Sequence, residues 1–237
     1  MNEDFAVLAD LEHSLRGPIA MAYRRARDVM AGHLSAQEMS DQIRAIMGLC
    51  GRARQILRNI DLLVKLHRNQ PIDLNVVRLS PADIVERLTT AAEEAKILAG
   101  RGRNEIICIN PADYDPLDRL SVLADLDLME QAFRAIIDNA TKYSFPRTPI
   151  RISGGVGAGG EFTISFVSEG LEISPEDLQH VGERGWRGRQ AMLTTGTGSG
   201  IGLWLVDNIL RAHRGKLMVA ATNSRDETIV TLSLPTI

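Results

Sequence analysis

The stretch GTGSGIGLWLVDNI, residues 196–209, places four alternating glycines directly before an apolar helix. Because glycine has no side chain, the backbone at Gly196, Gly198, Gly200 and Gly202 can approach a phosphate group closely. The first turn of the following helix offers unpaired N–H groups and the positive end of the helix dipole. No GK[ST] sequence is present, which excludes a Walker A loop, and no βαβ pattern follows, which excludes a dinucleotide fingerprint. The stretch therefore indicates a phosphate-binding loop, with a flexible turn as the plainer alternative.

A second stretch, FRAIIDNATKYS at residues 133–144, has the spacing of an amphipathic helix. Asn139 and Lys142 are three residues apart and so occupy adjoining positions on one face. An amide oxygen can complete the coordination shell of Mg²⁺, and a lysine can neutralise phosphate oxygens. Alone, such a helix is more often an ordinary one with a solvated polar face. In this order and at this separation, the two stretches are hard to explain by chance.

The first seventy residues are predicted to be helical almost throughout. Gly32 can end a first helix, and Ser35 with Glu38 has the spacing of a capping box at the start of a second. The second helix carries an apolar stripe at steps of three and four, made of Ile43, Ile46, Met47, Cys50, Leu57, Ile60, Val64 and His67. An antiparallel hairpin is too small to bury this stripe by itself, so we expect dimerisation into a four-helix bundle. The alternative is that the stripe packs against the rest of the chain.

Pro71 breaks the helical pattern, and strands mix with helices after it. Ser80 and Pro81 begin a predicted helix, and another helix is expected at 200–215. Strands are predicted at 104–110, 120–127, 149–155, 160–170, 216–223 and 227–235, with the last four forming two hairpins. We therefore expect an α+β protein, in which a helical hairpin at 1–70 precedes an α/β sandwich at 71–237.

Composition limits the function classes. The chain has 237 residues, 44% of them hydrophobic, and a formal net charge of −3, which excludes a disordered chain and gives no electrostatic case for nucleic acid. Two cysteines, Cys50 and Cys108, suit a reducing compartment and cannot by themselves form a zinc site. No uncharged apolar run approaches the ~20 residues that span a bilayer. We expect a soluble, cytoplasmic protein with no membrane segment.

Four segments carry a resemblance to a known family. DNATKYS at 138–144 resembles the N box of the histidine-kinase and related ATPase superfamily, and GSGIGL at 198–203 resembles its G2 box. Residues 167–188 are similar to the G1 and F boxes of sensor histidine kinases, and EHSLRGPIA at 12–20 resembles their H box. The resemblance covers nearly the whole chain in the family's order. It implies a dimerisation and histidine phosphotransfer hairpin followed by a catalytic ATP-binding domain.

The resemblance also implies the chemistry and its residues. His13 would take the γ-phosphoryl group of Mg·ATP and pass it to an aspartate on the receiver domain of a response regulator. Asn139 would hold Mg²⁺, and Lys142 would bind the phosphates. The remaining cofactor-binding positions, near adenine or in the loop around the phosphates, would be Tyr143, Ser168, Gly170, Gly198, Gly200, Gly202 and Leu203.

The H box and N box depart from the family. Ser14 stands where an acidic residue usually follows the histidine, and Glu12 is a poor substitute because one helical step turns the side chain by ~100°. Gly17 replaces the threonine or asparagine that positions water for phosphatase activity, so we expect little of that activity. Ala135 stands where hydrolytic relatives carry a glutamate base, which argues against ATP hydrolysis as the main reaction.

The G1 and F boxes depart as well. Ser168 replaces the aspartate that accepts a hydrogen bond from the adenine amino group, at a cost of about 1–2 kcal/mol. Gly182 and Gly185 replace both F-box phenylalanines, so we expect the ATP lid to pack differently. These changes leave a second interpretation open: a phosphotransfer protein or pseudokinase with the same fold and weak or no ATP turnover.

Overall fold

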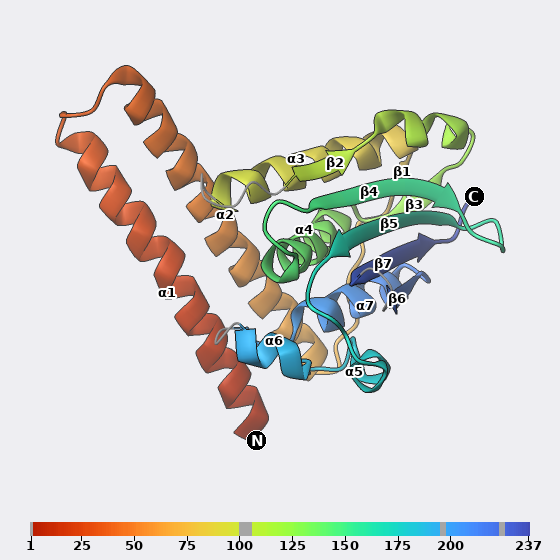
Figure 1. The fold of residues 1–237 in the computed structure, drawn as a ribbon. Helices are drawn as coiled ribbons and strands as arrows, with labels where there is room; N and C mark the ends of the chain where they lie inside the picture. The colour runs from red at the N-terminus through yellow and green to blue at the C-terminus, as the bar shows by residue number, and fades with distance from the viewer. Residues whose placement is uncertain (1, 100–105, 195–197, 223–225) are drawn as a thin grey trace.

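The computed structural model describes residues 2–99, 106–194, 198–222 and 226–237. Two long antiparallel helices, α1 (Asn2–Met30) and α2 (Ala36–His67), form the predicted hairpin at one side of the molecule (Figure 1). Gly32 follows α1 with φ of 74°, a conformation that favours glycine. The Ser35 hydroxyl accepts from the Glu38 N–H, and the Glu38 carboxylate accepts from the Ser35 N–H, so the capping box at the start of α2 is confirmed.

The predicted apolar stripe on α2 remains largely uncovered in the single chain. Ile43, Met47, Leu57 and Val64 are exposed, Met47 to 67%. Ile60 alone of these five packs against the hydrophobic core. The alternative in which the rest of the chain covers the stripe is therefore wrong for most of its length.

The remainder of the chain folds as two layers, with helices on one face of a mixed sheet. The sheet has the order β2 (Ile106–Ile109), β4 (Pro149–Val156), β5 (Phe162–Glu169), β7 (Glu227–Leu234) and β6 (Lys216–Thr222). β2 and β4 are parallel, and the other neighbours are antiparallel. Its buried face packs against α3 (Pro81–Ala99), α4 (Leu126–Tyr143) and α7 (Gly202–Ala212). The predicted α+β class is confirmed.

Short elements complete the fold. The two-stranded ribbon pairs β1 (Val77–Leu79) with β3 (Val122–Ala124), and α5 (Pro175–His180) and α6 (Arg189–Thr194) lie between β5 and α7 in the chain. Two turns of 3₁₀ helix, Pro111–Asp113 and Asp115–Leu117, precede β3. The sequence patterns did not single out β1, α5 or α6, because such short elements carry too few apolar positions to show a period.

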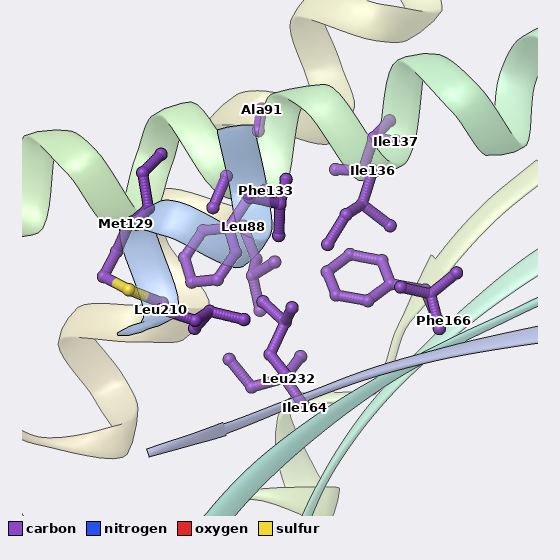
Figure 2. Packing of buried hydrophobic residues seen from close by; sticks show 14 of the residues in the cluster. Leu88, Ala91, Met129, Phe133, Ile136, Ile137, Ile164, Phe166, Leu210 and Leu232 are labelled. Carbon is purple, nitrogen blue, oxygen red and sulfur yellow. The ribbon is translucent and has the colours of Figure 1, made fainter. Parts of the chain in front are cut away.

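The core lies between α4, α7 and the sheet, as Figure 2 shows. Every second residue of β5, from Phe162 to Ser168, is buried, which places one face of this strand against the helices. Phe133 of α4 and Phe166 of β5 meet with ring centroids 6.5 Å apart. This packing fixes α4 above the sheet and so positions the polar residues at its C-terminal end.

Polar contacts join the hairpin to the second part of the chain. Arg52 Nη1 donates to Asp138 Oδ1 at 2.6 Å, and Gln131 Nε2 donates to Asn59 Oδ1 at 2.9 Å. The two contacts are seven residues apart on each helix and run in opposite chain directions, so α2 and α4 lie antiparallel here. Besides these polar contacts, Ile56, Leu62 and Leu63 of α2 are buried in the same hydrophobic cluster as residues of α3, α4 and α7.

The helix predicted at 200–215 is shorter than expected. It begins at Gly202 and ends at Ala212, because Gly200 has φ of 65° and the N–H of Gly215 bonds the carbonyl of Leu210 outside the regular helical pattern. Gly196 of the predicted phosphate-binding loop lies outside the described residues, as do parts of the strands predicted at 104–110 and 216–223.

Candidate nucleotide-binding site

A cavity of about 740 Å³ lies beside α4, the sheet and the segment that connects β5 to α7. All nine positions that the sequence assigned to nucleotide binding line it, although they come from α4, β5, α7 and the loops between them. These residues are Asn139, Lys142, Tyr143, Ser168, Gly170, Gly198, Gly200, Gly202 and Leu203. The fold thus brings together three segments that are far apart in the sequence.

Two contacts define the polar end of the cavity. A Cβ built at Gly202, at the start of α7, would lie 3.7 Å from the amide nitrogen of Asn139. A Cβ at Gly198 would lie 2.7 Å from Lys142 Nζ and 3.6 Å from Arg187 Nε. Two cationic side chains and one amide therefore converge on the glycine loop.

The N-terminus of α7 points into this end. Its N-cap residue, Ile201, makes no side-chain capping hydrogen bond. The first-turn N–H groups of a helix without a side-chain cap are donors for an anion, and the helix dipole favours negative charge there. Together with Lys142 and Arg187, these donors suit a chain of phosphates.

Asn139 fits the role of a Mg²⁺ ligand by its donor chemistry. Within the described part of the chain no cluster of three or more His, Cys, Asp or Glu side chains could hold a metal ion. Mg²⁺ commonly takes one or two protein oxygens and fills its octahedron with phosphate oxygens and water. One amide oxygen beside the phosphate donors is such an arrangement.

The opposite end of the cavity is mainly apolar and is formed by α4 and the sheet. Its lining includes Ile136 and Ala140 of α4 above Phe166 and Val230 of the sheet. A flat purine base suits such a slot, because burying apolar ring surface is favourable and the walls exclude water.

Gly170 and Tyr143 close this apolar end through their backbones. A Cβ at Gly170 would overlap the carbonyl oxygen of Tyr143, and the N–H of Leu171 donates to that carbonyl at 3.0 Å. Any larger residue at Gly170 would push α4 away from β5. Tyr143 also lies with its ring centroid 5.2 Å from Lys142 Nζ.

The segment between β5 and α7 forms the lid, defined here by its described residues 171–194 and 198–201. Gly182 and Gly185 have φ of 95° and 77°, a region in which phenylalanine would be strained. The Gly185 N–H donates to the carbonyl of Gly200 at 3.2 Å, which ties the lid to the glycine loop. The backbone conformation at these two positions therefore explains the glycines, and the predicted difference in lid packing from the family stays a prediction.

Aromatic side chains make contacts within the lid and between the lid and α7. His180 and Trp186 stack within the lid with ring centroids 4.5 Å apart. Arg184 lies with its guanidinium carbon 5.5 Å from the centre of the Trp204 ring on α7. The sequence showed these residues in the right region, but not which pairs they form.

His13 does not line this cavity in the chain as folded. It is exposed on α1, whereas Leu11 and Ser14 of the same helix line the cavity. A helical step of one residue turns the side chain by ~100°, so His13 points about 100° away from Ser14 and about 160° away from Leu11. Glu12 pairs with Arg16, whose Nε donates to it at 2.7 Å.

Comparisons with known proteins agree with this geometry. The family described as "Histidine kinase-, DNA gyrase B-, and HSP90-like ATPase" matches residues 124–237. Sensor-like histidine kinase SenX3 of Mycobacterium tuberculosis is 26% identical over 228 residues, which cover 96% of this chain and 53% of the relative. Signal transduction histidine-protein kinase BaeS of Escherichia coli K12 is 25% identical over 241 residues, covering 99% of this chain and 47% of BaeS. The chain therefore spans about half the length of the curated relatives it matches.

Solved structures share the fold. The mycobacterial sensor histidine kinase MprB superposes with a TM-score of 0.56 at 21% identity, over 68% of this chain and 98% of that one. Acinetobacter baumannii histidine kinase AdeS superposes with a TM-score of 0.52 at 21% identity, over 94% of this chain and 96% of that one. Among the residues described, no helix is both long and apolar enough to cross a bilayer.

Proposed function

We propose that this chain, whose residues 124–237 belong to the histidine kinase-, gyrase B- and HSP90-like ATPase family, acts as the transmitter core of a two-component sensor histidine kinase. It binds Mg·ATP through residues 71–237, phosphorylates His13 in the hairpin of residues 1–70, and passes the phosphoryl group to an aspartate of a response regulator. The observation that carries the proposal is the single cavity lined by all nine positions of the N, G1 and G2 boxes.

In this proposal the chain's own residues bind and orient the triphosphate. Lys142 and Arg187 neutralise phosphate oxygens, and the N–H groups at the start of α7 donate to them. Asn139 would hold Mg²⁺, which would supply positive charge to offset the phosphate oxygens. Ala135 has no carboxylate to activate water, so the triphosphate is kept for an imidazole nucleophile.

Transfer to His13 requires a second arrangement. The neutral imidazole must attack the γ-phosphorus in line, with ADP leaving on the opposite side. Because His13 points away from the cavity, the ATP-binding part must leave its present contact with α2, or a second copy must supply either the histidine or the nucleotide. The first route breaks the polar contacts between α2 and α4 and also exposes apolar residues of the hairpin, such as Leu11 and Ile56, that are buried in the shared core.

We extend the proposal to partners and location. The exposed stripe that includes Ile43, Met47 and Leu57 would be covered by a second copy in a four-helix bundle. The receiver domain of a response regulator would then dock near His13. A need for ATP and two cysteines that form no disulfide suit the cytoplasm.

One labelling experiment tests the kinase function. The full chain is incubated with γ-labelled Mg·ATP, and acid-labile, alkali-stable phosphate is measured on the wild type, His13→Ala and Lys142→Gln. We expect label on the wild type, none on His13→Ala and at least about tenfold slower labelling on Lys142→Gln, since a charge-assisted contact to phosphate is lost.

Other outcomes identify the alternatives. Nucleotide binding without label would contradict the kinase and support a pseudokinase. Label on His13 only when another kinase is added would support a phosphotransfer protein. The changes at Ser14 and Ser168 are the observations that favour these alternatives.

A further inference from the structure

The floor of the apolar end of the cavity carries a buried hydroxyl group. Ser168 is only 9% exposed, and among the buried polar residues of the described chain it is the one that lines the cavity. It lies on the same face of β5 as Phe162, Ile164 and Phe166, so its side chain faces the helices. A base held between α4 and the sheet would meet this hydroxyl at its edge.

A second hydroxyl lies directly opposite on the neighbouring strand. Ser168 pairs with Thr228 of β7, and Thr228 also lines the cavity. Side chains at paired positions share one face of a sheet, with Cβ atoms about 4.5–5.5 Å apart. The next pair on the same face of the sheet is Phe166 with Val230, which forms an apolar floor under the ring. The base would therefore face two neighbouring hydroxyl groups in an otherwise apolar slot.

No carboxylate shares this position among the residues described. Glu169 is the next residue on β5 and so points to the other face, where Arg151 lies 3.8 Å from its carboxylate. Glu172 is exposed at the rim of the cavity. The Asp177 carboxylate lies in the lid, 3.2 Å from the space that a Cβ at Gly188 would occupy. The other carboxylates that line the cavity, those of Glu94, Asp138 and Glu183, contact Arg134, Arg52 and His180. The paired strands thus present the hydroxyl groups of Ser168 and Thr228 to the buried edge of the base.

Hydroxyl groups and carboxylates select bases differently. A carboxylate only accepts hydrogen bonds, so it favours a 6-amino group and disfavours a 6-oxo group. A hydroxyl donates or accepts according to how it rotates. Adenine presents a donor at its 6-amino group and an acceptor at N1, whereas a 6-oxopurine presents an acceptor at O6 and a donor at N1. Two neighbouring hydroxyl groups can satisfy both patterns by exchanging roles.

We propose that this cavity binds 6-oxopurine nucleoside triphosphates as well as ATP, with Ser168 and Thr228 as the residues that determine base specificity. The inference rests on the proposed function only in that it places the nucleotide in this cavity. It adds a substrate class, of which inosine triphosphate is the simplest member.

Calorimetric titration of the full chain tests this, with Mg·ATP and Mg·ITP as probes and a His13→Ala background to prevent turnover. We expect the two dissociation constants of the otherwise unchanged chain to differ by less than about tenfold. Ser168→Asp should tighten ATP and weaken ITP, so that their ratio changes by at least about thirtyfold, because the carboxylate cannot donate to O6. Thr228→Val should weaken both nucleotides by similar factors.

Ser165→Asp is the matched control. It introduces the same carboxylate on the same strand but on the opposite face, where Ser165 contacts Thr231, so it should leave the ratio unchanged. A chain that binds ATP more than about tenfold tighter than ITP would overturn the inference, as would a Ser168→Asp variant with the original ratio. Binding of neither nucleotide would overturn both this inference and the proposed function. Binding of both nucleotides, together with no label on the wild-type chain in the separate labelling experiment, would overturn the kinase function alone.

Discussion

The contact between the glycine loop and the lid gives the sharpest prediction, through the variant Gly200→Ala. Gly200 has φ of 65°, and a Cβ there would lie 2.6 Å from the carbonyl carbon of Gly185 and 2.6 Å from the carbonyl oxygen of Trp186. Both obstacles are backbone atoms, so no side-chain rotation can relieve the overlap. The lid must move away from the glycine loop, and the hydrogen bond from the Gly185 N–H to the Gly200 carbonyl is lost.

The cost can be worked out from two parts. A left-handed backbone conformation costs an alanine about 1–2 kcal/mol. A lost backbone hydrogen bond costs about 1 kcal/mol. If the nucleotide-bound state needs this lid contact, the sum of about 2–3 kcal/mol weakens ATP binding by about 30- to 150-fold.

Two other glycines separate strain from overlap. Gly160, in the turn between β4 and β5, has φ of 83° and nothing within 4 Å of its Cβ position. Gly160→Ala should therefore lower the free energy of unfolding by about 1–2 kcal/mol and leave ATP binding unchanged. Gly182 in the lid has φ of 95° and equally open surroundings, so Gly182→Ala should weaken ATP binding less than Gly200→Ala does. Calorimetric titration measures the ATP affinity of all three variants. A dissociation constant of Gly200→Ala within threefold of wild type would refute the argument.

Four further predictions follow from other contacts. Arg134 of α4 pairs with Glu94 and with Glu130, which is 6% exposed, so Arg134→Met should lower the free energy of unfolding in urea by about 3–5 kcal/mol. Arg151→Met, which breaks a more exposed pair, should lower it by at most about 1 kcal/mol, and equal losses for the two variants would contradict this. The Ser80 N–H and hydroxyl donate to the Asp83 carboxylate and lower its pKa below the ordinary 3.8. The stability that these hydrogen bonds contribute is therefore present above pH 3.8 and is lost as the pH falls through the lowered pKa. Ser80→Ala should raise the pKa of Asp83 in an NMR titration, and an unmoved pKa would argue against the cap. Arg52→Asp and Asp138→Arg should each lower the free energy of thermal unfolding by at most about 1 kcal/mol, because the ion pair is half-exposed. The double variant should recover this stability, and no recovery would mean that the ion pair does not join the helices. Gly17 offers no side chain to position water, so the purified chain should dephosphorylate a phosphorylated response regulator slowly, and rapid loss of acyl phosphate would contradict this.

Local sequence patterns were sufficient for the long elements and for the candidate binding residues. The capping box of Ser35 and Glu38 acts between residues three apart, and the burial of every second residue along β5 repeats within a single strand. The N and G2 boxes were recognisable because Asn139, Lys142 and the glycines act through the type and spacing of neighbouring residues. Such features depend on the backbone period alone, so the sequence alone determined them.

Tertiary structure decided what meets across the cavity. The pairing of Ser168 with Thr228 depends on the register between β5 and β7, which are separated by almost sixty residues. The need for glycine at Gly185 comes from its positive φ and its contact with Gly200, whereas the sequence showed only a missing phenylalanine. The outward direction of His13 depends on which face of α1 packs inward. Each is a contact between distant parts of the chain, and the packing of the core, rather than any local pattern, sets its geometry.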